Sequence, residues 1–136
     1  MGESRNHINL VSVAYRCALS LVPNELRSLV QADTADTPKP SRIIRNYIPD
    51  VFFWNGDFMI IGEAKTFDDF ERPHSLSQYE AYLEECHIFS GTSVFIISVP
   101  WQLVFSAKNY FRRKKQKDDH SFRIIVVNEL CERYEI

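Results

Sequence analysis

The chain has 136 residues, of which 45% are hydrophobic and 13% aromatic, and its formal net charge at pH 7 is −2. This length and apolar content predict one folded domain, residues 1–136, with its own core. The near-neutral charge does not favour nucleic-acid binding by the surface as a whole, because most such domains are basic.

The sequence also indicates the cellular compartment in which the protein is expected. No run of eighteen apolar residues occurs, so we expect no membrane span, and the first residues lack the layout of a signal peptide. Cys17, Cys86 and Cys131 are widely spaced and odd in number, which argues for a reducing compartment and against a disulfide framework or a zinc knuckle. We therefore expect a cytoplasmic protein.

The first predicted element is a helix over about 5–22, where apolar residues recur at helical spacing. Pro23 stops or kinks this helix, and 24–31 add another turn or two. Two prolines predict a loop over 32–41, and 42–46 are expected to form a short strand.

The next two elements form a predicted hairpin. Two apolar runs, 48–54 and 57–66, flank Asn55-Gly56, a pair that favours a type I′ turn because both residues tolerate a positive φ. With this pair as a two-residue loop, Trp54 is expected to pair with Asp57.

This register places charged side chains together on one face. Counting outward, Asp50 falls opposite Ile61, and the period of two puts Glu63 and Lys65 on the same face, with Asp50 diagonal to Glu63 at about 7–8 Å. Two carboxylates on an apolar hairpin repel each other, and a divalent cation such as Mg²⁺ or Mn²⁺ would remove that repulsion. A neighbouring lysine suits a reaction at a phosphate. The alternative is a Glu–Lys pair at the solvated end of a strand.

A helix is predicted after an acidic loop that contains Asp68 and Asp69, which we expect to be solvated. Ser75 or Ser77 caps this helix, which runs to about residue 89 and ends at Gly91.

Gln78 and Tyr82 lie at i,i+4 on one face of that helix. A core position suits Gln78 poorly, because a buried amide needs all its hydrogen-bond partners. The alternative is an ordinary helix surface with a partly buried tyrosine.

The remaining elements complete a mixed sheet. The apolar run 92–99 predicts a strand covered on both faces and parallel to the second hairpin strand, reached through a right-handed crossover. A helix over 101–117 and a last strand over 121–127 follow. The predicted fold class is therefore α/β, with a mixed β-sheet flanked by helices.

The predicted third helix ends in a basic block, Arg112, Arg113, Lys114 and Lys115 with Lys117. Such a block contacts phosphates in some proteins, and in others it is a solvated helix end that suits the helix dipole.

Two motifs carry a family resemblance. Pro49-Asp50, twelve intervening residues and Glu63-Ala64-Lys65 resemble the signature of the PD-(D/E)XK nuclease superfamily. The sequence from Gln78 to Tyr82 resembles the Gln-x-x-x-Tyr motif of its RecB-type branch. The resemblance covers 49–99, a little over a third of the chain.

The resemblance implies a restriction-endonuclease-like fold with an α-β-β-β-α-β core and a metal-dependent nuclease that hydrolyses DNA phosphodiester bonds. It implies that Asp50 and Glu63, helped by the Ala64 carbonyl, bind Mg²⁺, for which Mn²⁺ can substitute. Lys65 would then position and activate the attacking water.

The same resemblance gives roles to three further residues. Gln78 would orient the metal site and Tyr82 would hydrogen-bond a phosphate. An acidic residue of the first helix often joins the metal in this superfamily, and Glu3, one turn before His7, is the candidate; Glu25 is a weaker one. Glu3 is equally well explained as an acidic residue in a first helical turn.

Two other classes of function stay open. The fold can serve as a non-catalytic DNA-binding or protein-interaction module, which would not need Asp50, Glu63 and Lys65 together. A nuclease that acts on RNA, or only within a larger assembly, is the second, and the near-neutral charge favours it. Homodimer formation also stays open.

Overall fold

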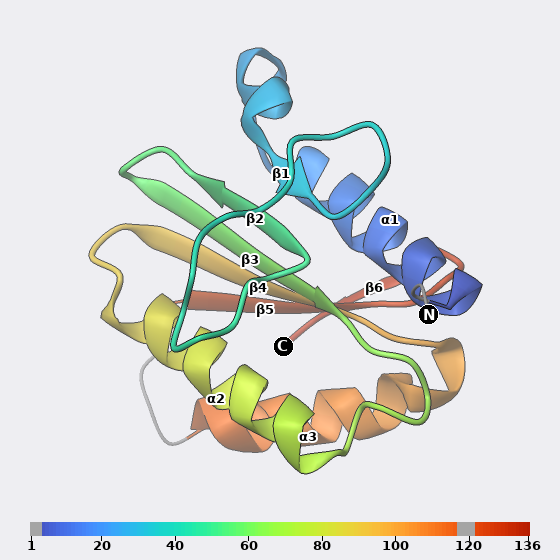
Figure 1. The fold of residues 1–136 in the computed structure, drawn as a ribbon. Coiled ribbons are helices and arrows are strands. Elements are labelled where there is room, and N and C mark those ends of the chain that lie inside the picture. Colours follow the sequence, from blue (N-terminus) through green and yellow to red (C-terminus); the bar gives the residue numbers. More distant parts are fainter. Residues whose placement is uncertain (1–3, 117–121) are drawn as a thin grey trace.

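The computed structural model describes residues 4–116 and 122–136, and their strands form one six-stranded sheet in the order β1-β2-β3-β4-β5-β6 (Figure 1). The helices are α1 (Arg5–Leu19), η1 (Asn24–Leu29), α2 (Pro73–Ile88), η2 (Trp101–Leu103) and α3 (Val104–Gln116), where η marks a 3-10 helix. The strands are β1 (Gln31–Ala32), β2 (Val51–Trp54), β3 (Phe58–Ala64), β4 (Thr92–Ser98), β5 (Phe122–Val127) and β6 (Arg133–Glu135).

The sheet is mixed, as predicted. β2 and β3 are antiparallel, β3, β4 and β5 are parallel, and the outer strands β1 and β6 are antiparallel to their neighbours. The protein is therefore an α/β protein with helices on both faces of the sheet, and the carboxyl ends of its three parallel strands meet at one edge.

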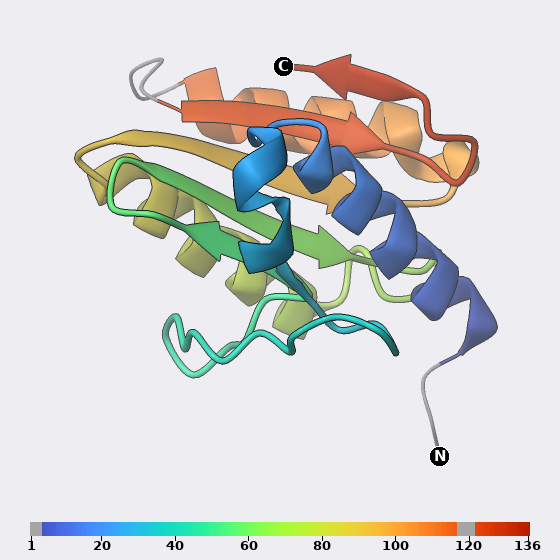
Figure 2. The ribbon, with the colours of Figure 1, turned by 90° about the horizontal axis from the view of Figure 1, so that it is seen from above.

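Each face of the sheet has its own core. α1 covers one face, where Ala14 and Cys17 pack with Ile60 and other buried apolar residues of the sheet, whereas α2 and α3 cover the other (Figures 1 and 2). On this second face Phe95 lies between Tyr82 of α2 and Phe111 of α3, with ring centroids 6.1 and 5.5 Å from its own. Both faces of the central strands are thus buried, which explains their continuous apolar runs.

The hairpin forms, but the predicted register is wrong by two residues. Trp54 pairs with Met59 instead of Asp57, and Gly56 is the hairpin residue with a positive φ, 98°. The side chain of Asn55 accepts hydrogen bonds from the backbone N–H groups of Asp57 and Phe58, at 3.0 and 2.9 Å. These bonds favour a turn centred on Gly56-Asp57, with glycine at its first central position.

Three predictions about strands need correction. Residues 42–46 form no strand; Ile44 and Tyr47 make an isolated bridge around Arg45 and Asn46, which both have positive φ values of 49° and 71°. β1 lies at the start of the stretch predicted as a loop, where it adds to the edge of β2. The strand predicted as the last is followed by β6, which turns back antiparallel beside β5.

The predicted helix ends also shift. α1 ends at Leu19, and the first residues of the third predicted helix form the 3-10 helix η2. The predicted serine caps of α2 do not form, because α2 begins at Pro73. The Ser75 hydroxyl instead donates to the carbonyl of Asp69 at 2.6 Å. Among the described residues, no helix is both long and apolar enough to cross a membrane.

Gly91 does not end α2, whose C-cap is Phe89. It instead allows two backbone segments to meet, because a Cβ at this position would lie 2.2 Å from the carbonyl oxygen of Asp57. That carbonyl accepts a 2.9 Å hydrogen bond from the N–H of Thr92, which joins the hairpin to the start of β4.

We therefore expect Gly91→Ala to lower the free energy of unfolding by about 3 kcal/mol, because backbone atoms cannot rotate away from the added methyl group. Gly56→Ala is the control. It adds a methyl group to open space at a positive φ and should cost about 1 kcal/mol. Urea unfolding measures both, and equal losses would contradict this role of Gly91.

Candidate functional site

The site begins with two carboxylates on adjacent strands. The register pairs Val51 with Gly62, so the next pair outward is Asp50 with Glu63. Gly62 allows the strands to approach here, because a Cβ on it would lie 2.9 Å from the Cβ of Val51. The Oδ2 of Asp50 accepts a 2.9 Å hydrogen bond from the N–H of Ala64. Asp50 therefore lies directly opposite Glu63, closer than the predicted diagonal.

Lys65 and Gln78 complete a buried polar cluster beneath α2. The Nζ of Lys65 lies 3.5 Å from the Oε2 of Glu63 and donates a hydrogen bond to the Oε1 of Gln78. The backbone N–H of Lys65 is held by the carbonyl of Ser98, at 3.0 Å. Glu63 and Lys65 are only 4% and 8% exposed, which rules out a solvated pair at a strand end.

A histidine of α1 reaches the same carboxylates. The Nε2 of His7 lies 3.5 Å from the Oδ2 of Asp50. Ser4 caps the helix by accepting a 3.1 Å hydrogen bond from the N–H of His7, which places His7 in the first turn, over the end of β3. Sequence reasoning expected an acidic residue of this helix at the site and did not select His7; Glu3 lies outside the described residues.

The electrostatics of the cluster centre on Glu63. Burial raises the pKa of Glu63 well above the ordinary range of a carboxyl group, the negative charge of Asp50 raises it further, and Lys65 opposes both effects. Within residues 4–116 and 122–136 the Oε1 of Glu63 has no hydrogen bond of good geometry, although Tyr82 lies close enough to lower the pKa of Glu63 through hydrogen bonding. A buried carboxyl oxygen without a partner beside a second carboxylate is costly unless a proton or a cation is present.

Tyr82 is fully buried, in contrast to the partly buried alternative. Burial raises the pKa of its hydroxyl, and the charges of Glu63 and Asp50 raise it further. The hydroxyl has no hydrogen bond of good geometry within the described part of the chain, but it lies close enough to Glu63 and Gln78 for hydrogen bonding to contribute to its pKa. Gln78 and Tyr82 do share the inner side of α2, but Gln78 orients Lys65, and the Tyr82 hydroxyl lies beneath the carboxylates instead of at an open surface.

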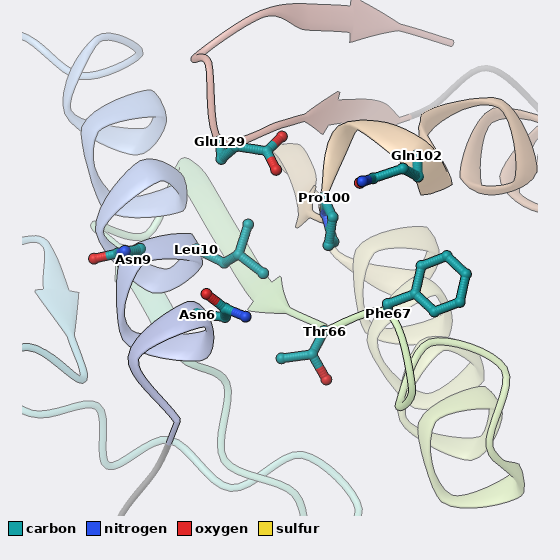
Figure 3. Close-up of a pocket in the computed structure, with 8 residues that line it drawn as sticks. All are labelled: Asn6, Asn9, Leu10, Thr66, Phe67, Pro100, Gln102 and Glu129. Carbon is teal, nitrogen blue, oxygen red and sulfur yellow. The ribbon is translucent and has the colours of Figure 1, made fainter.

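Two pockets adjoin the cluster at the carboxyl end of β3. One, of about 580 Å³, is lined by Ser4, Asn6, His7, Thr66, Asp68, Asp69 and Arg72. The other, of about 370 Å³, shares Asn6 and Thr66 and extends to Pro100 and Glu129 (Figure 3). His7, whose Nε2 lies 3.5 Å from Asp50, and Thr66, the residue after Lys65, line the larger pocket and so connect it to the cluster, although Asp50, Glu63 and Lys65 are not themselves among the lining residues.

The acidic loop beside the pockets is bound to its own neighbours. As predicted, Asp68 and Asp69 are exposed. The Oδ2 of Asp69 accepts a 3.1 Å hydrogen bond from the Thr66 hydroxyl, and its Oδ1 lies 3.3 Å from the Nε of Arg72. These contacts fix the loop that leads from β3 to α2.

The basic block lies away from this site. α3 begins just after the carboxyl end of β4 and runs back along the sheet, so Arg112 and Arg113 lie near the opposite edge (Figure 1). Lys114 lies 3.3 Å from Glu80, and Lys115 donates to the carbonyl of Ile136 at 3.0 Å. The helical rise places Arg112–Lys115 about 12–17 Å from the start of α3. Lys117 lies outside the described residues.

Within residues 4–116 and 122–136, no group of three or more His, Cys, Asp or Glu side chains is arranged to hold a metal ion. Asp50 and Glu63, with a backbone carbonyl such as that of Ala64, form an oxygen donor set of the kind that Mg²⁺ and Mn²⁺ prefer.

Comparisons of the chain with protein-family models, with curated proteins and with solved structures found no match.

The raised pKa of Glu63 predicts a pH-dependent stability. The folded state holds the Glu63 proton more tightly than the unfolded state, so this stabilisation is complete below about pH 4.3 and is lost as the pH rises through the raised pKa. E63Q removes the charge, so in EDTA we expect it to be more stable than the wild type at pH 8, by about 1–3 kcal/mol, with the difference vanishing near pH 4.

Urea unfolding at a series of pH values measures this difference. Glu71→Gln, at an exposed position, is the control and should change stability by less than about 0.5 kcal/mol at any pH. A constant difference between E63Q and the wild type would show that Glu63 does not titrate as the cluster predicts.

Proposed function

We propose that this protein is a metal-dependent nuclease that hydrolyses DNA phosphodiester bonds. The observation that supports the proposal best is the convergence of Asp50, Glu63 and Lys65 in one buried cluster, next to His7, which lines a pocket. Two facing carboxylates do not stabilise the sheet, and in the described chain one of them has a buried oxygen without a hydrogen bond of good geometry.

The donor set fits a hard divalent cation. Asp50, Glu63 and the Ala64 carbonyl would hold Mg²⁺ or Mn²⁺, and the unpartnered Oε1 of Glu63 is the kind of ligand such a site requires. When bound, the ion would supply Lewis-acid stabilisation of the charge that develops on the phosphate. His7, beside Asp50, would orient this carboxylate from the side of α1.

Lys65 would act on water and phosphate. The hydrogen bond to Gln78 and the nearby Glu63 carboxylate fix its ammonium group beyond the carboxyl end of β3. From there it can hold the attacking water in line with the phosphorus and offset negative charge in the transition state. Gln78 therefore supports the reaction through Lys65, and Tyr82 supports it through the Glu63 carboxyl beneath which it lies.

The element order supports a restriction-endonuclease-like fold for this proposal. α1, β1, β2, β3, α2 and β4 follow one another in the order α-β-β-β-α-β, with β1 in place of the strand predicted at 42–46. We accordingly assign the chain, as a proposal, to the PD-(D/E)XK superfamily, with DNA as its partner and the cytoplasm as its location.

Metal binding and cleavage should separate the roles of the residues. Because Glu63 and Lys65 are buried, near-isosteric variants test them best. Metal at about 100 Kd should stabilise the wild type by about 2.7 kcal/mol, and D50N and E63Q should lose most of this gain. K65M should keep it, yet cleave supercoiled or single-stranded DNA at least 100-fold more slowly, on the order of the loss of one transition-state contact.

Lys39→Met removes an exposed lysine and is the control for K65M. Thermal unfolding with and without Mg²⁺ or Mn²⁺ and gel-based cleavage provide the two readouts. Wild-type cleavage rates in D50N, E63Q and K65M would refute the assignment as an enzyme.

The basic block can be tested through salt. If about four of its side chains meet phosphates, log K should fall with log[salt] at a slope near −3.6, a loss of about 10²-fold between 50 and 200 mM salt. Replacing Arg112, Arg113 and Lys114 by Gln should remove most of this slope and weaken all sequences alike. Binding is measured in Ca²⁺, which keeps the DNA intact.

A control variant with Gln at Arg16, Arg27 and Lys39 removes the same charge from other exposed positions. Equal slopes in the two triple variants would mean that the block is a solvated helix end. The phosphate contacts that bind DNA would then come from another part of the chain or from a partner.

A further inference from the structure

Exposed aromatic side chains gather at one edge of the sheet. Four Phe and Trp residues are among the large exposed apolar side chains of the described chain: Trp54, Phe67, Trp101 and Phe105. Phe67 follows β3, and Trp101 and Phe105 follow β4, so three of the four lie outside the carboxyl ends of the parallel strands. Trp54 ends β2, at the hairpin turn and therefore at the opposite edge.

These three side chains form what we call the aromatic rim: Phe67, Trp101 and Phe105, which are 61%, 58% and 75% exposed. Phe67 lines the smaller pocket together with Gln102, the residue after Trp101 (Figure 3). Phe105 follows Trp101 by about one helical turn. Three large exposed rings at one edge of the sheet, one of which lines a pocket, mark a binding surface, because single exposed apolar side chains are normal but a concentration of them is not.

The rim is continuous with the proposed site. Thr66 lines both pockets and lies between Lys65 and Phe67 in the chain. The Cα atoms of Lys65 and Phe67 are therefore at most about 7 Å apart. A ligand whose phosphate lies at Lys65 can place the group next to it against the rim.

Two of the nearby acids, Glu129 and Asp69, are bound to protein donors, whereas Asp68 is exposed at the larger pocket. Glu129 accepts a 2.7 Å hydrogen bond from the N–H of Trp101, and Asp69 is paired with Thr66 and Arg72. The lysines and arginines of the basic block lie about 12–17 Å along α3 from its start. Close to the site, the surface therefore offers ring faces without the dense positive charge of the basic block.

We propose that the aromatic rim binds the unpaired bases of single-stranded nucleic acid and so directs the proposed nuclease to single strands or frayed ends. Every base has a face that stacks on an aromatic ring, whereas in a continuous duplex these faces are covered by neighbouring base pairs. This inference depends on the proposed function for its catalytic consequence, but the binding itself does not require cleavage.

The test measures binding by the whole chain in EDTA, by fluorescence anisotropy. The labelled probes are a twelve-nucleotide oligothymidylate, a blunt duplex and an abasic oligomer, all of the same strand length. We expect the oligothymidylate to bind more tightly than the abasic strand, and W101A and F105A to weaken it about 10- to 100-fold, the effect of losing one base stack. Duplex affinity should change less than about 3-fold.

Trp54→Ala, which removes an equally exposed aromatic side chain at the opposite edge, is the matched control and should leave all three affinities unchanged. In W54F, Trp101 is the tryptophan that remains, and the oligothymidylate should quench its fluorescence.

Two results overturn the inference. In the first, the rim variants bind the oligothymidylate as tightly as Trp54→Ala does, which would leave the rim as a surface for another protein. In the second, the wild type binds the abasic strand as tightly as the oligothymidylate. If single strands bind through the rim and the wild type cuts no DNA with Mg²⁺ or Mn²⁺, the inference stands and the proposed nuclease activity fails.

Discussion

Two carboxylates facing each other across β2 and β3 are the constraint around which the site is built. Gly62 lets the two strands approach at the pair just before Asp50 and Glu63, so the charges meet where α2 and the sheet exclude water. In a low-dielectric interior their repulsion is not screened. Lys65, Gln78 and the backbone N–H of Ala64 compensate part of it. Burial first, and then the remaining repulsion from Asp50, raises the pKa of Glu63.

The hairpin shows how far local sequence rules reach. Asn55-Gly56 predicted a hairpin, and the period of two predicted that Asp50, Glu63 and Lys65 share one face. The hairpin and the shared face are both confirmed. The register was wrong because the Asn55 side chain binds the N–H groups after the glycine, which moves the turn forward by one residue. A shift of two residues in pairing keeps every side chain on its face. The predicted grouping of the three side chains was therefore correct although the predicted register was wrong.

Features that depend on distant parts of the chain were not predictable in this way. β1 and β6 are two and three residues long, and their pairing partners define them more than their own composition does. His7 carries no local signal for a role, because its distance from Asp50 depends on how α1 crosses the sheet. The same holds for Tyr82: spacing placed it beside Gln78 on α2, but only the packing of α2 against Phe95 shows that its hydroxyl is buried under the carboxylates.

The two edges of the sheet divide the chemistry that a phosphodiesterase would need. Parallel strands bring their carboxyl ends to one edge, and the residues that follow β3 and β4 supply Lys65, the pockets and three exposed rings there. α3 returns along the sheet and carries its cations to the other edge, where they also suit the negative end of the helix dipole. A net charge of −2 therefore says little about either edge. A nucleic-acid strand that follows α3 would meet ring faces at the carboxyl edge and positive charge about 12–17 Å further on. Short-range stacking would hold it at the site, while the distant charge would attract it through a field that salt weakens.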